Sequence, residues 1–124
     1  MTVLVDSDIL MEVSRGKDPE VLARWTELSR SEDVILYSPV TLAELWTGAR
    51  PREHEAITNL FAALLCAPID RETGRMAGDY LRHYRKSHGL ELGDALIAAG
   101  AVLHHAELWT RDRKHYPMRE LSFY

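Results

Sequence analysis

Residues 1–10 read MTVLVDSDIL, and this stretch decides the fold. Four residues that favour an extended chain, at positions 2–5, run directly into Asp6, Ser7 and Asp8, and the chain then turns apolar again. The pattern predicts a buried strand that delivers two carboxylates at its end. Acids are also common in turns and at helix starts, so these ten residues leave open whether the acids hold a cation.

The rest of the chain alternates strand-like and helix-like segments. Strands are predicted at residues 2–5, 34–37, 66–69 and 107–110, with a candidate fifth at 121–124. Helices are predicted at 18–30, from Pro39 onward, and at 52–64, 71–87 and 95–103. Strands separated by helices imply a parallel sheet covered on both faces. We therefore expect one α/β domain over residues 1–124.

Composition narrows the classes of protein. The single cysteine, Cys66, lies in an apolar run and is expected in the core, as are Trp25, Trp46 and Trp109. One cysteine cannot form an internal disulfide, which fits a reducing compartment. No secretory leader and no apolar run of membrane-spanning length is evident, so we expect a cytoplasmic protein.

Five acids fall where open parallel sheets bind ligands, beyond the carboxyl ends of the strands. They are Asp6, Asp8, Glu44, Asp94 and Asp112. Carboxylates held together repel one another unless a cation neutralises them. Oxygen ligands without a nearby His or Cys cluster suit Mg²⁺ or Mn²⁺, which can activate water and stabilise charge on a phosphoryl group.

Each acid also has a purely structural explanation. Asp6 or Asp8 can cap a helix, and Glu44 can complete a capping box with Thr41. Asp94 suits the positive end of its helix, and Asp112 suits a turn. The six histidines show no paired zinc-ligand spacing, and no phosphate-cradling glycine loop is present.

Four segments carry a family resemblance: VLVDSDIL at residues 3–10, SPVTLAELWTGA at 38–49, LGDALIAAGA at 92–101 and LWTRDRKHYP at 108–117. In this order they resemble PIN-domain ribonucleases, specifically the VapC-type toxins of bacterial toxin–antitoxin pairs. The resemblance covers essentially the whole chain. It implies a PIN-like α/β/α sandwich with a central parallel sheet of four to five strands, and an acid cluster that binds Mg²⁺ or Mn²⁺.

The resemblance also implies roles for individual residues. It assigns catalysis and metal binding in the hydrolysis of RNA phosphodiesters to Asp6, Glu44, Asp94 and Asp112. Thr110 matches the family's small hydroxyl residue and would assist the ligands. The family often has a neutral polar residue at the position of Asp8 and Asn at that of Asp112. The role of Asp8, as ligand or as helper, is therefore open.

The expected partners are RNA and a VapB-type antitoxin. Arg111, Arg113 and Lys114 flank the acids and can contact substrate phosphates, although a solvated loop is the alternative. The net charge of −4 gives no global attraction to RNA, so local basic groups or bound metal must supply it. By resemblance, the antitoxin tail would lie across the active-site groove, and a homodimer or a toxin–antitoxin hetero-oligomer is expected.

Parts of the sequence also fit two other functions. Haloacid-dehalogenase-like phosphatases also place Asp-x-Asp after the first strand, but a Gly-Thr-like pair should follow, where this chain has Ile9 and Leu10. Their late motif needs a second acid four residues after Gly-Asp, where Ala98 stands. The third hypothesis is a catalytically inactive PIN-fold module that binds RNA or a partner. Metal binding distinguishes the two hypotheses, because the nuclease requires a metal ion and the inactive module does not.

Overall fold

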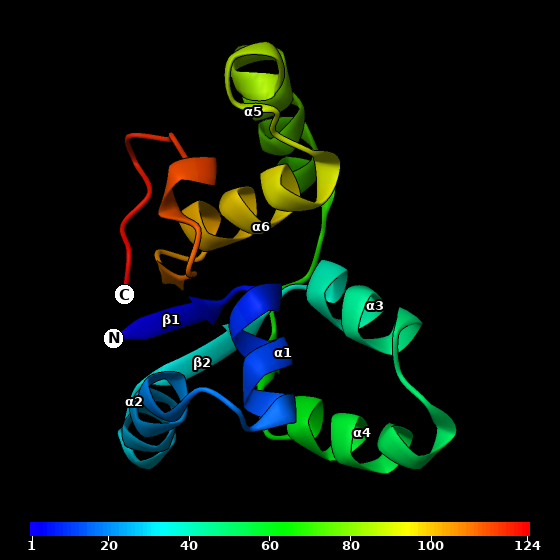
Figure 1. Cartoon of the computed structure of the whole chain (residues 1–124). Coiled ribbons are helices and arrows are strands. Elements are labelled where there is room, and N and C mark those ends of the chain that lie inside the picture. Colours follow the sequence, from blue (N-terminus) through cyan, green and yellow to red (C-terminus); the bar gives the residue numbers. More distant parts are fainter.

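The computed structural model describes residues 1–124 and is built on a four-stranded, all-parallel sheet (Figure 1). The strands are β1 (Thr2–Val5), β2 (Val34–Tyr37), β3 (Leu65–Cys66) and β4 (Glu107–Trp109), in the order β3-β2-β1-β4. In the central strand, Leu4 is paired with Leu36 of β2 and with Leu108 of β4. The predicted parallel α/β architecture is confirmed.

Helices cover both faces of this sheet (Figure 1). One layer contains α1 (Ser7–Arg15), α2 (Pro19–Arg30), α3 (Pro39–Thr47) and α4 (His54–Ala62), and the other contains α5 (Arg71–His88) and α6 (Leu92–Leu103). Two short 3₁₀ turns, η1 (Pro51–Glu53) and η2 (Arg113–His115), lie in the connections. None of the helices combines the length and the apolar character needed to cross a membrane.

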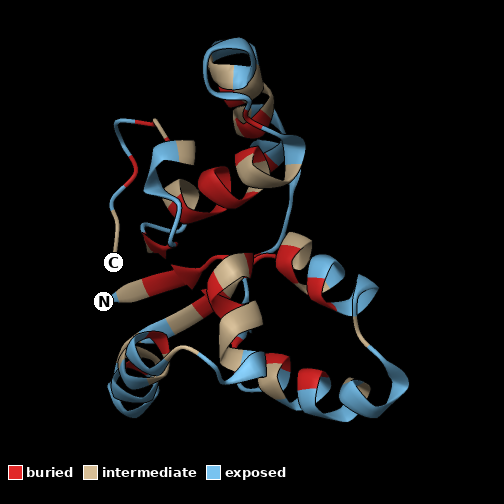
Figure 2. Cartoon of the chain, viewed as in Figure 1, coloured by how far each residue is buried: buried red, intermediate tan, exposed pale blue.

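A hydrophobic core lies between the sheet and each of the two helical layers, and β1 contributes to both cores. Leu4 belongs to the core under α5 and α6, whereas Val3 and Val5 belong to the core under the other four helices. This division follows from the alternation of side chains along a strand. Figure 2 shows β1 buried along most of its length. The first strand is therefore fixed from both sides, which fixes the position of Asp6 at its end.

Helix α6 is apolar on every side, as predicted for residues 95–103. Its residues Ala95, Ile97, Ala98, Ala99 and Ala101 are all buried. The small side chains let the helix lie close to the sheet, and a Cβ added at Gly100 would be 3.5 Å from Leu4. Asp94 lies in the first turn of this immobilised helix.

Several sequence predictions were wrong in detail. Helix α1 was not predicted, and the predicted helix 52–64 is divided into η1 and α4. Cys66 is exposed because β3 is an edge strand, and Trp46 is 43% exposed and stacks on His54 outside both cores. The candidate fifth strand is a single bridge between Leu108 and Phe123.

Gly78→Ala and Gly89→Ala are a matched pair with opposite expected effects on stability. Gly78 lies inside α5 with open space around its Cβ position, so alanine should stabilise the protein by about 0.5–1 kcal/mol. Gly89 ends α5 at φ 62°, and alanine there should cost about 1–2 kcal/mol. Urea unfolding measures both, and a shift of the same sign in the two variants contradicts this account.

Candidate active site

A cavity of about 320 Å³ lies at the carboxyl end of the sheet and gathers the predicted acids. It is lined by Asp6, Ser7, Asp8, Met11, Glu44, Glu91, Asp94, Asp112, His115 and Tyr116. The acids come from the β1–α1 junction, from α3, from the start of α6 and from the loop after β4. The structure thus brings together Asp6, Asp8, Glu44, Asp94 and Asp112, and adds a sixth acid, Glu91.

Asp6 is the most buried acid of the cavity, with 8% of its surface exposed. It caps α1: its Oδ1 accepts a hydrogen bond from the Ser7 N–H at 2.7 Å. Its Oδ2 accepts one from the Tyr116 hydroxyl at 2.9 Å. Burial, followed by the charge of Asp8, raises the pKa of Asp6 to about 6. The site therefore favours a cation beside this carboxylate.

Glu44 is held by the Ser7 hydroxyl, which is itself hydrogen-bonded to Thr41. The Ser7 hydroxyl donates to Glu44 Oε1 at 3.0 Å and lies 2.9 Å from the Thr41 hydroxyl, with which it also shares a hydrogen bond. Ser7 and Thr41 are both buried. Ser7, at the start of α1, therefore orients the carboxylate of Glu44 on α3 toward the cavity. Thr41 supports Ser7 through its hydroxyl and does not form the predicted capping box, because the residue that caps α3 is Ser38.

Asp94 and Asp112 lie on either side of His115. His115 Nε2 is 3.1 Å from Asp94 Oδ2, and its Nδ1 is 3.9 Å from Asp112 Oδ2. The backbone N–H of Asp112 donates to the Thr110 hydroxyl at 3.1 Å, so Thr110 shapes the loop that carries Asp112. A histidine between two carboxylates holds the start of α6 to the loop after β4.

Asp8 has one satisfied and one free oxygen. Its Oδ2 accepts from the backbone N–H of Arg111 at 3.1 Å, whereas its buried Oδ1 has no hydrogen-bond partner. Burial raises the pKa of Asp8. A buried carboxylate oxygen without a partner is costly, which makes Asp8 a candidate to bind a further group.

The three basic residues predicted to contact RNA differ in their surroundings. Arg111 is paired with Glu12 and Asp18. Arg113 lies over the Phe123 ring at 5.2 Å and donates to the Tyr124 carbonyl. Lys114 is exposed and makes no ion pair. Lys114 is therefore the residue of the three with a side chain free for a phosphate.

The donor set of the cavity fits a hard divalent ion. Its acids offer only oxygen, and Asp8 Oδ1 is unpartnered. As the side chains stand, no three acidic or histidine residues surround one point closely enough to ligate an ion. Two carboxylates completed by water is an arrangement that Mg²⁺ commonly adopts, and it needs no such group of three.

Sequence reasoning missed four polar residues of the cavity: Ser7, Glu91, His115 and Tyr116. Glu91 lies three residues before Asp94, a helical spacing that could have indicated it. His115 and Tyr116 stood inside a quoted motif, but a neutral phenol and a lone histidine carry no metal-ligand pattern of their own. Their partners, Asp94 and Asp6, are distant in sequence and only the fold reveals them.

A family model, curated relatives and solved structures all match this chain over most of its length. The PIN domain family model matches residues 3–121. Ribonuclease VapC10 of Mycobacterium tuberculosis is 39% identical over 120 residues, which are 95% of this chain and 88% of that protein. Toxin FitB of Neisseria gonorrhoeae is 31% identical over 124 aligned positions, covering 89% of this chain and 87% of that protein. The structure of VapBC-1 from nontypeable Haemophilus influenzae is similar in fold, with a TM-score of 0.81 at 20% identity, covering 100% of this chain and 97% of that chain.

The burial of Asp6 predicts a pH-dependent difference between wild type and Asp6→Asn in metal-free buffer. Because the pKa of Asp6 rises from 3.8 to about 6 on folding, ionisation penalises the folded wild type increasingly as pH rises between these values. The penalty approaches roughly 3 kcal/mol above pH 6. Asparagine keeps the cap without the charge. The variant should thus gain stability relative to wild type across this window.

Urea unfolding in EDTA at several pH values from 4 to 8 measures this difference. Glu27→Gln, which removes an exposed acid on α2, is the control for the loss of one negative charge. A free-energy difference between wild type and Asp6→Asn that stays constant over the window contradicts the assignment.

Proposed function

The chain belongs to the PIN-domain family, and from this premise we propose that it is a metal-dependent endoribonuclease that acts as the toxin of a type II toxin–antitoxin system. The related proteins named Ribonuclease VapC10 and Toxin FitB support the reaction and the biological role. Family membership leaves the haloacid-dehalogenase-like phosphatase without support. We place its action in the cytoplasm, where RNA is available and an unpaired cysteine is stable.

One observation carries the proposal more than any other. Six carboxylates line one small cavity, and no Lys or Arg lines it with them. Charges of one sign are not gathered in this way without a functional reason, since their repulsion costs stability. Mg²⁺ or Mn²⁺ is the partner that this set of oxygen donors suits best.

The proposed mechanism assigns a task to four of the six acids. We infer that Asp6 and Asp94 hold the ion directly, that Glu44 ligates it or orients the attacking water, and that Asp112 completes the charge cluster. When bound, a divalent ion supplies Lewis acidity and neutralises the charge that develops on the phosphoryl group. Tyr116 and Ser7 keep Asp6 and Glu44 in place through their hydroxyl groups.

RNA must approach this negative cavity against the charge of the protein. Lys114 is our candidate for a direct phosphate contact, because it lies exposed in the loop after Asp112 and pairs with no acid. Arg113, on the same loop, is a second candidate, although its side chain already packs on Phe123. The main compensation must come from the cation site itself, since the net charge is −4.

A groove beside the cavity suits the VapB-type antitoxin that we propose as partner. A cavity of about 520 Å³ between α1 and α4 has a largely apolar lining that includes Val13, Ala56, Ile57 and Leu60. A smaller cavity shares Ile57 with it and shares Glu44 with the acidic site. An amphipathic segment of the antitoxin laid along α1 would therefore extend from apolar contacts to the acids.

RNA cleavage by the antitoxin-free protein tests the reaction. Structured RNAs should be cut with Mg²⁺ or Mn²⁺ and left intact with EDTA. Asp6→Asn should lose more than the ~10–100-fold that removal of an outer partner of a metal ligand costs, because Asp6 is assigned to the ion itself. Glu27→Gln should cut as wild type does. Cleavage that persists in EDTA contradicts the metal dependence, and the absence of both cleavage and metal binding supports the inactive binding module.

Thermal unfolding with and without Mn²⁺ tests the cation site separately from catalysis. Mn²⁺ should raise the melting temperature of wild type by several degrees, because it binds only the folded cluster. Asp6→Asn or Asp94→Asn should abolish most of this rise. A rise of equal size in both variants would show that the ion binds elsewhere.

A further inference from the structure

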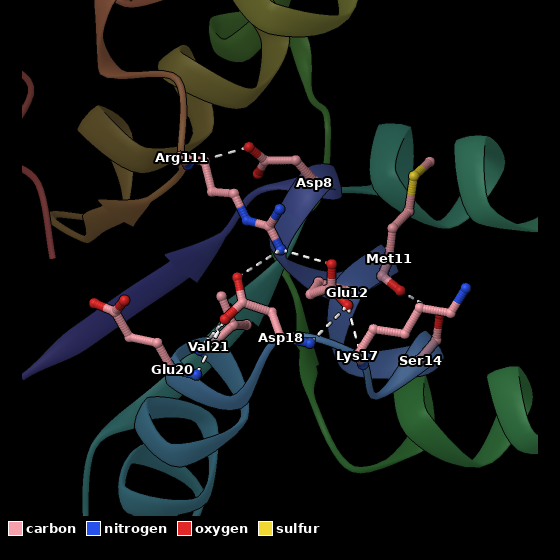
Figure 3. A network of polar contacts seen from close by, with 9 residues as sticks. All are labelled: Asp8, Met11, Glu12, Ser14, Lys17, Asp18, Glu20, Val21 and Arg111. Carbon is pink, nitrogen blue, oxygen red and sulfur yellow. Dashed lines mark hydrogen bonds and ion pairs between the residues drawn. The ribbon is translucent and has the colours of Figure 1, made fainter.

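Arg111 lies between Thr110 and Asp112 in the loop after β4, but its side chain does not line the acidic cavity. It extends instead toward Glu12 of α1 and Asp18 at the start of α2 (Figure 3). Its Nη2 lies 2.9 Å from Glu12 Oε1 and 3.6 Å from Asp18 Oδ2. Figure 3 shows the guanidinium between these two carboxylates. Both contacts are made by Nη2, so this end of the guanidinium is paired with the protein's own acids.

The two acids that hold Arg111 are themselves fixed. Glu12 is 16% exposed, and its Oε2 accepts from the backbone N–H groups of Lys17 and Asp18, each at 3.2 Å. The hydrogen bond from Arg111 is the main cause that lowers the pKa of Glu12. Asp18 caps α2. The Arg111 side chain is therefore tied to the end of α1, to the α1–α2 connection and to the start of α2.

The backbone of Arg111 connects this anchor to the acids. Its N–H donates to Asp8 Oδ2 at 3.1 Å, and Asp8 lines the acidic cavity. The other oxygen of Asp8, Oδ1, is buried and has no partner. Anchoring the loop thus fixes one oxygen of Asp8 and leaves the second available to another group.

We propose that Arg111 is a positioning residue, which anchors the loop after β4 so that its backbone N–H holds Asp8 as an additional carboxylate of the cation site. The proposal rests on the metal-dependent function proposed above and gives a role to Asp8, which the sequence left open. It also replaces the expectation that Arg111 contacts RNA. Drawing the guanidinium away toward a phosphate would leave both Glu12 and Asp18 without their charge partner.

The affinity of the RNA-free protein for Mn²⁺, measured by calorimetry, distinguishes the two roles of Arg111. Arg111→Ala and Glu12→Gln break the anchor from opposite sides, and Asp8→Asn removes the carboxylate that it serves. Each should weaken Mn²⁺ binding about 10-fold, as loss of a residue that orients a metal ligand does. Adding Arg111→Ala to Asp8→Asn should weaken it little further, because both act through one carboxylate.

RNA binding in EDTA, measured with a non-cleaved RNA, is the second readout. Arg111→Ala should change it less than about twofold, whereas the loss of a phosphate contact would weaken it and reduce its salt dependence. Arg75→Ala is the matched control, because Arg75 also pairs with two acids, Glu72 and Asp79, but on α5 and outside the cavity. It should leave Mn²⁺ affinity unchanged.

Unchanged Mn²⁺ affinity in folded Arg111→Ala and Glu12→Gln overturns the proposal, as does weakened RNA binding with normal Mn²⁺ affinity. If Arg111→Ala fails to fold, Glu12→Gln and Asp8→Asn decide alone. The wild type separates the two levels of inference. If it binds Mn²⁺ and cuts RNA while the variants match it, only the role of Arg111 is wrong. If it does neither, the proposed function itself is wrong and the role of Arg111 falls with it.

Discussion

The structure depends on a carboxylate that is buried at the end of its central strand. Asp6 follows β1, accepts the first hydrogen bond of α1 and has its own backbone N–H bonded to the Trp109 carbonyl at 2.9 Å. It is thus built into two elements at once and cannot move away from Asp8. Its pKa of about 6 records the cost of that position. A cost of roughly 3 kcal/mol in ionised form is a large part of a typical domain's stability of about 5–15 kcal/mol.

The burial of apolar side chains in two continuous cores offsets the free-energy cost of burying the Asp6 carboxylate. Val3, Leu4 and Val5 are fully buried and pack alternately into the layers on the two faces of the sheet. Helix α6 does for Asp94 what β1 does for Asp6, because the burial of Ala95 and of residues 97–101 fixes the helix that carries Asp94 in its first turn. Asp6 and Asp94 are therefore carried by buried, well-packed elements, which keeps these two carboxylates close together despite their repulsion.

Sequence patterns predicted the parts of this molecule that follow from local periodicity. Strands β1, β2 and β4, the all-apolar helix and the convergence of Asp6, Glu44 and Asp94 follow from apolar runs and from the rule that ligands lie beyond strand ends, whereas the strand predicted at 66–69 lies at Leu65–Cys66. What escaped prediction depends on neighbours distant in sequence. The exposure of Cys66 follows from the edge position of β3, and the partnership of Tyr116 with Asp6 joins residues 110 positions apart. An apolar run shows that a segment can be buried, but its place in the sheet decides whether it is.

The charged residues around the site have two different roles. Negative charge is concentrated in the cavity, whereas Arg111 is paired with Glu12 and Asp18 and links the loop after β4 to α1 and α2. In the loop after β4, Lys114 is exposed and pairs with no acid. Binding of a polyanionic substrate therefore depends chiefly on the divalent cation that the acids bind. The same ion that takes part in the chemistry must also screen the negative charge of the cavity. Any cationic group that occupies the acids instead, including one supplied by a protein partner, removes both functions at once. In such a site, inhibition requires no change in the fold, only competition for a fixed excess of negative charge.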